Sequence, residues 1–340
     1  MARRDLIVVG ASAGGIEALV TLLRKLPADL PATVLVVVHL SPTGGNALAA
    51  ILDRAGPLRA RTARGQETLA VGEVIVAPAG QHLLVLDGRT ALSRGPRENG
   101  HRPAVDVLFR SAARAAGARV ISLVLSGALD DGAAGSVAVR SRGGAVLAQA
   151  PTEAPYPGMP QAAVAAAGAE AVELAALPDR LLALLDEEVD PDGAPPPSDL
   201  ITKETAIADM EPDAIQSLDR PGHPSGYSCP DCHGSLFSIE ERGMRRFRCR
   251  VGHAWSADSL LAQHDLAVEG ALWMALRTLE EKAALSADLA GRARANDQLL
   301  TADRFMVQSE ELGGAADLIR RLLVDGLDRE EQAVPDVRPS

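Results

Sequence analysis

The fold of this chain is decided near its start by the stretch LIVVGASAGGIEAL, residues 6–19. The apolar run 6–9 predicts a β-strand, and residues 16–19 continue into a helix. Ser12 falls in the turn between them, inside a Gly10-x-Ser12-x-Gly14 pattern. Small residues in such a turn let the backbone approach a phosphate, or let it bend sharply enough to expose a nucleophilic side chain.

A nucleotide site is the first alternative, because the same glycine pattern resembles the opening turn of short-chain dehydrogenases. A dinucleotide site needs an acidic residue at the end of the second strand, where it bonds the ribose hydroxyls. Here the second apolar strand, residues 33–38, ends in His39. Those dehydrogenases also need a tyrosine followed four residues later by lysine, and neither Tyr156 nor Tyr227 has one. Nucleotide binding is therefore disfavoured.

A serine esterase is the second alternative, because three apolar strands each end in a residue that such an enzyme needs. Ser12 follows the first strand and His39 the second, while the strand 120–125 leads to Asp130 and Asp131. The carboxyl ends of parallel strands meet at one edge of a sheet. Serine, imidazole and carboxylate together activate a hydroxyl, since the base takes its proton and the acid holds the ring in one tautomer.

Each of these residues also has an ordinary structural explanation. Serine and aspartate are common helix caps, and a single strand-end histidine often only packs. Their occurrence at three strand ends favours the esterase, and at this point either aspartate fits the third role.

The first 186 residues resemble the catalytic domain of the CheB family of chemotaxis protein-glutamate methylesterases. Six segments follow the family's order: Gly10–Gly15, Val38–Pro42, Ala77–Leu83, Arg102–Phe109, Leu125–Gly135 and Gly158–Pro160. The family usually has Thr-Gly-Met-Gly before its aspartate, whereas this chain has Ser126-Gly127-Ala128-Leu129.

The resemblance implies a catalytic role for each residue of the set. Ser12 would be the nucleophile, His39 the general base and Asp131 the orienting acid, because the family's aspartate directly precedes a Gly-Ala pair. We predict an oxyanion and substrate pocket made by Ala13, Gly14 and Met159. No cofactor is expected for catalysis.

The resemblance also implies a reaction and a partner. The reaction is hydrolysis of glutamate γ-methyl esters on methyl-accepting chemoreceptors or related signalling proteins, and some relatives also deamidate receptor glutamine. The family's usual receiver domain is not expected here, since the first strand begins near residue 5.

Composition agrees with an enzyme of the cytoplasm. Hydrophobic residues make up 47% of the 340 residues, and the formal charge of −11 argues against a nucleic-acid-binding protein. No apolar stretch reaches the ~20 residues that a membrane span requires, so we expect no membrane insertion.

The chain alternates apolar strands with helices, which predicts an α/β fold with a doubly wound, mainly parallel sheet and helices on both faces. The runs 74–77 and 83–86 lie too close for a helical crossover, so we expect them to form an antiparallel hairpin. The methylesterase domain is predicted at 1–186. An acidic, proline-rich linker follows at 187–222, a zinc-ribbon-like module at 223–256 and a helical region at 257–330.

The second domain carries the only three cysteines of the chain, Cys229, Cys232 and Cys249, with His253 after the last of them. Such spacing predicts a closed structural zinc site, with His233 as a reserve ligand. A disulfide framework is disfavoured by the odd number of cysteines.

Five arginines lie around Phe247 in the same module: Arg242, Arg245, Arg246, Arg248 and Arg250. Short zinc ribbons often bind nucleic acid, but a solvated face or a protein-docking surface is the more common role of such a hairpin. Leucine periodicity from 257 to 295 predicts a helix, and 314–327 a shorter one. The alternative to an enzyme is a non-catalytic adaptor that binds signalling helices and uses the zinc module as its interaction surface.

Overall fold

A seven-stranded parallel sheet forms the centre of the N-terminal part of the chain. The computed structural model describes residues 2–39, 47–191, 193–217 and 221–325. Every neighbouring pair in the sheet is parallel, in the order β10-β9-β8-β2-β3-β5-β4. In that order the strands are Glu170–Val172, Ala145–Gln149, Val120–Val124, Leu6–Ala11, Thr33–Val38, Glu73–Val76 and Arg59–Thr62.

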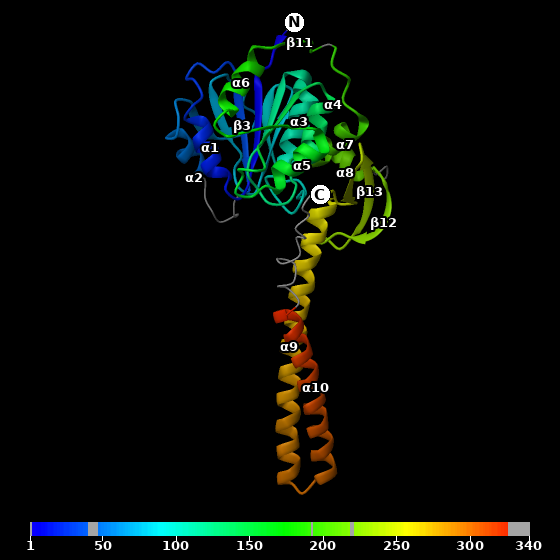
Figure 1. Ribbon diagram of the computed structural model, residues 1–340. Helices are drawn as coiled ribbons and strands as arrows, with labels where there is room; N and C mark the ends of the chain where they lie inside the picture. The colour runs from blue at the N-terminus through cyan, green and yellow to red at the C-terminus, as the bar shows by residue number, and fades with distance from the viewer. Residues whose placement is uncertain (1, 40–46, 192, 218–220, 326–340) are drawn as a thin grey trace, which may run out of the picture. The chain divides into compact units, whose positions relative to one another are not determined.

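Helices cover both faces of this sheet (Figure 1). In β2, Ile7 and Val9 pack on the side of α1 (Gly15–Leu23), α2 (Ala47–Asp53) and α6 (Leu177–Asp186). Leu6 and Val8 pack on the side of α3 (Val105–Ala116), α4 (Ala133–Ser141) and α5 (Gly158–Ala167). Strands buried on both faces must be apolar throughout, and the predicted doubly wound fold is confirmed.

The strand order reverses beside β2. The chain passes from β2 to β3 on one side and returns through α3 to β8 on the other side. The loops after β2 and β8 therefore lead away in opposite directions from the carboxyl edge, and doubly wound folds bind their ligands at such a reversal of strand order.

An antiparallel hairpin is present, but the predicted pairing of its strands is wrong. The run 74–77 belongs to β5 of the parallel sheet, where Val74 and Val76 are buried. The run 83–86 lies in β6 (His82–Leu86), which pairs with β7 (Arg89–Ser93). A second antiparallel pair joins β1 (Ala2–Arg3) to β11 (Glu188–Val189).

The segment 187–222, which composition predicts to be a linker, contains two helices. They are α7 (Asp199–Ala208) and α8 (Pro212–Gln216). Ser198 caps α7 by accepting a hydrogen bond from the Ile201 N–H. Ile201 and Glu204 of α7 are buried, so this part of the segment packs. The domain boundaries themselves stay a prediction.

The cysteine-containing module is a four-stranded antiparallel sheet. Its strands, in order, are β12 (His223–Ser228), β13 (Ser235–Glu241), β14 (Met244–Cys249) and β15 (Ala254–Ser256). Residues 1–261 form one compact unit, so this sheet and the parallel sheet belong together.

A second compact unit begins at residue 262 and contains two long helices. They are α9 (Ala257–Ala295, which begins in the first unit) and α10 (Leu299–Asp325), and Leu276, Ala316 and Leu323 are buried between them. The second helix starts 15 residues earlier than its leucine pattern predicts, and residues 326–330 of the predicted region lie outside the described part. Among the described helices, none is both long and apolar enough to cross a membrane.

Candidate active site and metal cluster

Ser12 lies in the turn that joins β2 to α1. The register pairs Ala11 with Val38, so Ser12 and His39 take the next matching positions on neighbouring strands. The Ser12 N–H donates to the Ser126 carbonyl, 2.9 Å away, on the other neighbouring strand end. Gly14 begins the helix with φ +71°, a left-handed conformation that favours glycine. The turn therefore places Ser12 between the ends of the two neighbouring strands.

His39 and Asp131, the aspartate that the family resemblance favours, are in direct contact. The distance from His39 Nε2 to Asp131 Oδ2 is 2.7 Å, although 92 positions separate the residues. Their side chains are only 6% and 2% exposed. A carboxylate on Nε2 places the ring proton there, which leaves Nδ1 as the basic nitrogen.

The Asp131 carboxylate accepts four hydrogen bonds. Oδ2 accepts from His39 and from the Val105 N–H at 2.7 Å. Oδ1 accepts from the Asp106 N–H and from Asn99 Nδ2, both at 3.1 Å. Burial raises the pKa of Asp131, but the hydrogen bond and charge of His39 outweigh it and hold the pKa well below its usual value. Asp131 is therefore ionised at neutral pH.

A second histidine lies against the first. The rings of His101 and His39 are stacked, with centroids 3.6 Å apart. Burial, and then the charge of His39, lower the pKa of His101 to about 4. His101, Asn99 and Asp106 were not singled out from the sequence. A run of polar residues in the loop just before α3 could have indicated them, because functional residues often lie on such loops.

The residues predicted to form an oxyanion pocket are Ala13, Gly14 and Met159. In the described part of the chain, the N–H groups of Ala13 and Gly14 donate no hydrogen bond, and they lie just before α1. Met159 is fully buried, and its N–H donates to the Gly127 carbonyl at 2.9 Å. A Cβ on Gly127 would lie 2.1 Å from Met159 Sδ and 2.9 Å from Ser12 Cβ. Met159 and Ser12 thus both pack against Gly127, a position where a larger residue does not fit.

The Asp130 side chain bonds two serines rather than His39. Its Oδ1 accepts hydrogen bonds from Ser256 Oγ at 2.7 Å and from Ser259 Oγ at 3.0 Å. Burial is the main cause that raises the pKa of Asp130. The carboxylate that reaches the histidine is therefore that of Asp131.

Cys229, Cys232, Cys249 and His253 come together in the small sheet, and this cluster could hold a metal ion. Their four ligand atoms lie within 4.8 Å of one another. Cys232 Sγ is 3.6 Å from Cys249 Sγ, which in turn is 3.5 Å from His253 Nδ1. A tetrahedral ion with metal–sulfur bonds of about 2.3 Å needs edges of roughly 3.8 Å, so the donor set fits. His233, the reserve ligand, is outside the cluster.

The arginines of the module divide into two groups. Arg246 and Arg248 are buried, whereas Arg242, Arg245 and Arg250 are exposed. Arg246 Nη1 lies 3.0 Å from Glu204 Oε1, and Arg248 Nη2 lies 2.9 Å from both Glu204 and Glu98. The arginine-rich hairpin therefore docks on the chain itself rather than presenting five free charges.

A surface cavity of about 330 Å³ lies beside the module, lined by residues of α5 and of the β13–β14 turn and by Asp130. Neither Ser12 nor His39 lines it, so it is separate from the candidate active site.

A model of the CheB methylesterase family matches residues 7–181, just over half of the chain. The chain belongs to the CheB methylesterase family. The family match covers Ser12, His39, Asp131 and Met159, and it ends before the metal cluster.

Curated relatives named protein-glutamate methylesterase/protein-glutamine glutaminase are about equally similar to this chain. Those of Methanosarcina acetivorans and Symbiobacterium thermophilum are both 41% identical, over 167 and 162 residues. These alignments cover 47% of this chain, and 47% and 45% of the relatives. The one of Xanthomonas oryzae pv. oryzae is 41% identical over 184 residues, which cover 53% of this chain and 51% of that relative. The chain thus matches about half the length of these relatives.

A solved structure, the CheB methylesterase catalytic domain of Thermotoga maritima, shares the fold. It has a TM-score of 0.51 and 29% identity, and covers 54% of this chain and 99% of that domain. The similarity confirms the family resemblance of the catalytic half. The small sheet with the Cys/His cluster and the long helices lie beyond the family match.

Proposed function

We propose that this chain is a serine esterase that hydrolyses glutamate γ-methyl esters on chemoreceptor-type signalling proteins. The observation that carries the proposal is the 2.7 Å contact of His39 Nε2 with the ionised Asp131, beside the strand end that bears Ser12. The names of the relatives support the substrate class and make glutamine deamidation a second activity of the same site.

Acylation begins when Ser12 Oγ attacks the ester carbonyl and gives its proton to His39 Nδ1. The imidazolium that forms is stabilised by the Asp131 carboxylate through Nε2–H. The carbonyl oxygen becomes an oxyanion, for which the N–H groups of Ala13 and Gly14 are the available donors. Such a donor is typically worth ~3 kcal/mol in the transition state.

The intermediate then collapses. The bond from carbon to methoxy oxygen breaks, the leaving oxygen takes the proton from Nδ1, and methanol departs. A water molecule then attacks the acyl-serine while His39 takes its proton. The bond from the carbonyl carbon to Ser12 Oγ breaks, Ser12 takes the proton back from His39, and the glutamate carboxyl group is released and ionises. His101, neutral because its pKa is about 4, covers one face of the His39 ring and keeps it in plane for both steps.

The test is methanol release from a methylated receptor by the intact chain. Ser12→Ala abolishes release while the circular dichroism spectrum stays the same. Ser141→Ala is the matched control, because its hydroxyl bonds only the Ala138 carbonyl within α4, and it keeps full activity. If wild type releases no methanol from any receptor it binds, the non-catalytic adaptor is favoured instead.

We also propose that Cys229, Cys232, Cys249 and His253 bind a structural Zn²⁺. Four protein ligands complete a tetrahedral coordination shell. Asp231 Oδ2 lies 3.8 Å from His253 Nε2, the ring nitrogen that faces away from the cluster, where a carboxylate favours the ring orientation that ligates through Nδ1. The three cysteines are unpaired, which fits a cytoplasmic protein whose thiols stay reduced.

Metal analysis of purified variants tests the zinc proposal. His253→Ala loses the zinc, whereas His233→Ala retains it, because His233 lies outside the cluster. Wild-type protein that carries no zinc, or loss of zinc in both variants alike, contradicts the assignment.

A further inference from the structure

The strand that leaves the metal cluster runs directly to the candidate active site. β15 begins at Ala254, the residue after His253, and pairs with β14 on one side. On its other side it meets the segment 97–99 of the catalytic domain. Asn99 N–H donates to the Ala254 carbonyl at 2.8 Å, and Ala254 N–H donates to the Arg97 carbonyl at 3.2 Å. Backbone hydrogen bonds therefore join the metal-binding sheet to the loop before α3.

The Asn99 side chain continues this connection to Asp131. Its Oδ1 accepts from the Ser256 N–H at 2.9 Å, and its Nδ2 donates to Asp131 Oδ1 at 3.1 Å and to Asp106 Oδ2 at 3.0 Å. An amide has its acceptor on one end and its donors on the other. The Ser256 N–H thus fixes which end faces the two carboxyl groups.

A second connection runs through the adjacent carboxylate. Ser256 Oγ and Ser259 Oγ both donate to Asp130, which precedes Asp131 in the loop after β8. Ser256 is therefore connected to the loop that carries the catalytic acid in two ways: its hydroxyl bonds Asp130 directly, and its N–H bonds Asn99, whose amide bonds Asp131.

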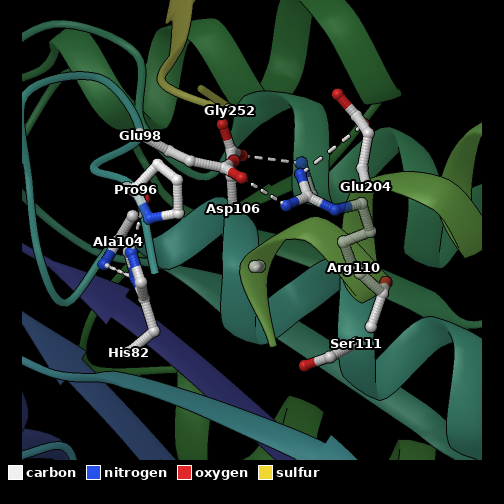
Figure 2. Close-up of polar contacts among 12 residues, drawn as sticks. His82, Pro96, Glu98, Ala104, Asp106, Arg110, Ser111, Glu204 and Gly252 are labelled. Carbon is white, nitrogen blue, oxygen red and sulfur yellow. Dashed lines mark hydrogen bonds and ion pairs between the residues drawn. The ribbon is translucent and has the colours of Figure 1, made fainter. Parts of the chain in front are cut away.

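Buried charges hold the metal-binding sheet in this position. Arg248 donates to the Gly252 carbonyl at 2.7 Å and to Glu98 at 2.9 Å, so it ties the turn between two metal ligands to the residue before Asn99. Glu98 also accepts from Arg110 of α3 at 2.7 Å, and Arg110 Nη1 lies 3.7 Å from Glu204 of α7 (Figure 2). Removing one member of such a buried cluster leaves an unpaired buried charge and is costly, so the cluster stabilises the docked position of the small sheet.

We propose that the metal-binding sheet is a positioning element of the esterase: metal binding fixes β15, and β15 orients Asn99, which holds Asp131 in line with His39. Asn99 is a positioning residue, since it contacts Asp131 and not the reacting atoms. This inference rests on the esterase function proposed above and adds metal dependence to it.

Asn99→Gly in the intact chain tests the side-chain step. Asn99 has φ +52°, a conformation that glycine adopts without strain, so the backbone bond to Ala254 is preserved. The variant retains its metal, its kcat falls roughly 10- to 100-fold, and KM stays within about 2-fold because substrate contacts are unchanged. Asp87→Gly is the matched control, since Asp87 has φ +46° in the exposed β6–β7 turn, and its kcat equals that of wild type.

The pH profile separates positioning from a general loss of stability. Asp131 without its Asn99 donor is a more basic partner for the imidazolium, so the acidic midpoint of kcat/KM moves to higher pH in Asn99→Gly. A variant that is merely less stable keeps the wild-type midpoint.

Chelation of the metal tests the coupling. Wild type loses activity by about the same factor as Asn99→Gly, and chelation of Asn99→Gly adds little, because both changes remove the same Asn99 side-chain contact with Asp131, on which the proposal places the effect. The proposal is overturned if the losses of activity caused by chelation and by Asn99→Gly multiply when combined. It is also overturned if chelation leaves the kcat of wild type unchanged.

A readout without substrate separates this inference from the esterase proposal. The proton NMR signal of the His39 Nε2–H that faces Asp131 shifts on chelation in wild type and is already shifted in Asn99→Gly. If it shifts but no ester is hydrolysed, the coupling stands and the esterase proposal fails. If esters are hydrolysed and neither signal nor rate responds, the coupling is wrong.

Discussion

The His101 ring lies flat against the His39 ring, with centroids 3.6 Å apart and planes 10° apart. Burial, and next the charge of His39, lower the pKa of His101 from 6.5 to about 4. Between these values the unfolded chain binds a proton that the folded chain does not, so stability rises with pH across this window and is constant above it. We expect the free energy of unfolding by urea to be lower at pH 5 than at pH 7.5.

His101→Phe checks the origin of this pH dependence. Phenylalanine keeps an aromatic ring on His39 but cannot take up a proton, so the difference in unfolding free energy between pH 5 and pH 7.5 becomes smaller. An unchanged difference would assign the pH dependence to other groups, of which His82 is the first candidate, since burial also lowers its pKa.

Asp131→Asn and Asp130→Asn rank the two neighbouring carboxylates. Asp131→Asn lowers kcat by about 10,000-fold, because the amide presents its N–H₂ to His39 and favours the wrong tautomer. Asp130→Asn has a much smaller effect, because Asp130 bonds serine hydroxyls and not His39. Steady-state kinetics on both variants, with circular dichroism to confirm folding, decide the ranking, and the reverse order would show that Asp130 is the catalytic acid.

Gly127→Ala tests how closely Ser12 and Met159 are packed. The added methyl group would overlap Met159 Sδ and crowd Ser12 Cβ. Overpacking of this kind costs roughly 1–3 kcal/mol of stability, and the displaced Ser12 reacts more slowly with a fluorophosphonate. Gly291→Ala, where nothing lies within 4 Å of the new Cβ, leaves the labelling rate unchanged. Equal labelling of the two variants would contradict the packing described for Ser12.

Glu204→Gln tests the buried charge cluster. The substitution leaves Arg110, Arg246 and Arg248 with too little negative charge, so we expect a loss of about 3–5 kcal/mol in the free energy of unfolding. Glu240→Gln is the control, because its partner Arg245 is exposed and such pairs contribute little. Urea denaturation measures both, and a Glu204→Gln chain as stable as the control would mean that the cluster does not hold the sheet in place.

The positions of the candidate catalytic residues could be predicted because the sequence marks where apolar strands end. Ser12, His39 and the Asp130–Asp131 pair each follow a buried strand, and a parallel sheet brings such ends to one edge. The metal ligands could be predicted because their spacing is local. The Asn99–Asp131 contact could not, since nothing near Asn99 indicates which of several polar groups it faces.

Two features of the fold could not be predicted from the local sequence pattern. The short gap between β5 and β6 suggested a hairpin, but β5 finds its partners in β3 and β4. The composition of 187–222 suggested solvent exposure, yet Glu204 is buried. Arg246 and Arg248 neutralise its charge, and they lie 42 and 44 positions later in the sequence. Composition records that a residue is charged, but not which distant residue neutralises it.

The burial of Trp255 among Cys229, Cys249 and Phe247 supplies an optical probe at the point where the two sheets meet. The chain has one other tryptophan, Trp273, which is 52% exposed. An indole in a dry pocket emits at shorter wavelength than one in water, so the two emissions differ in colour. A change in the shorter-wavelength emission, that of Trp255, therefore reports without labelling whether the small sheet has released the loop that carries Asn99.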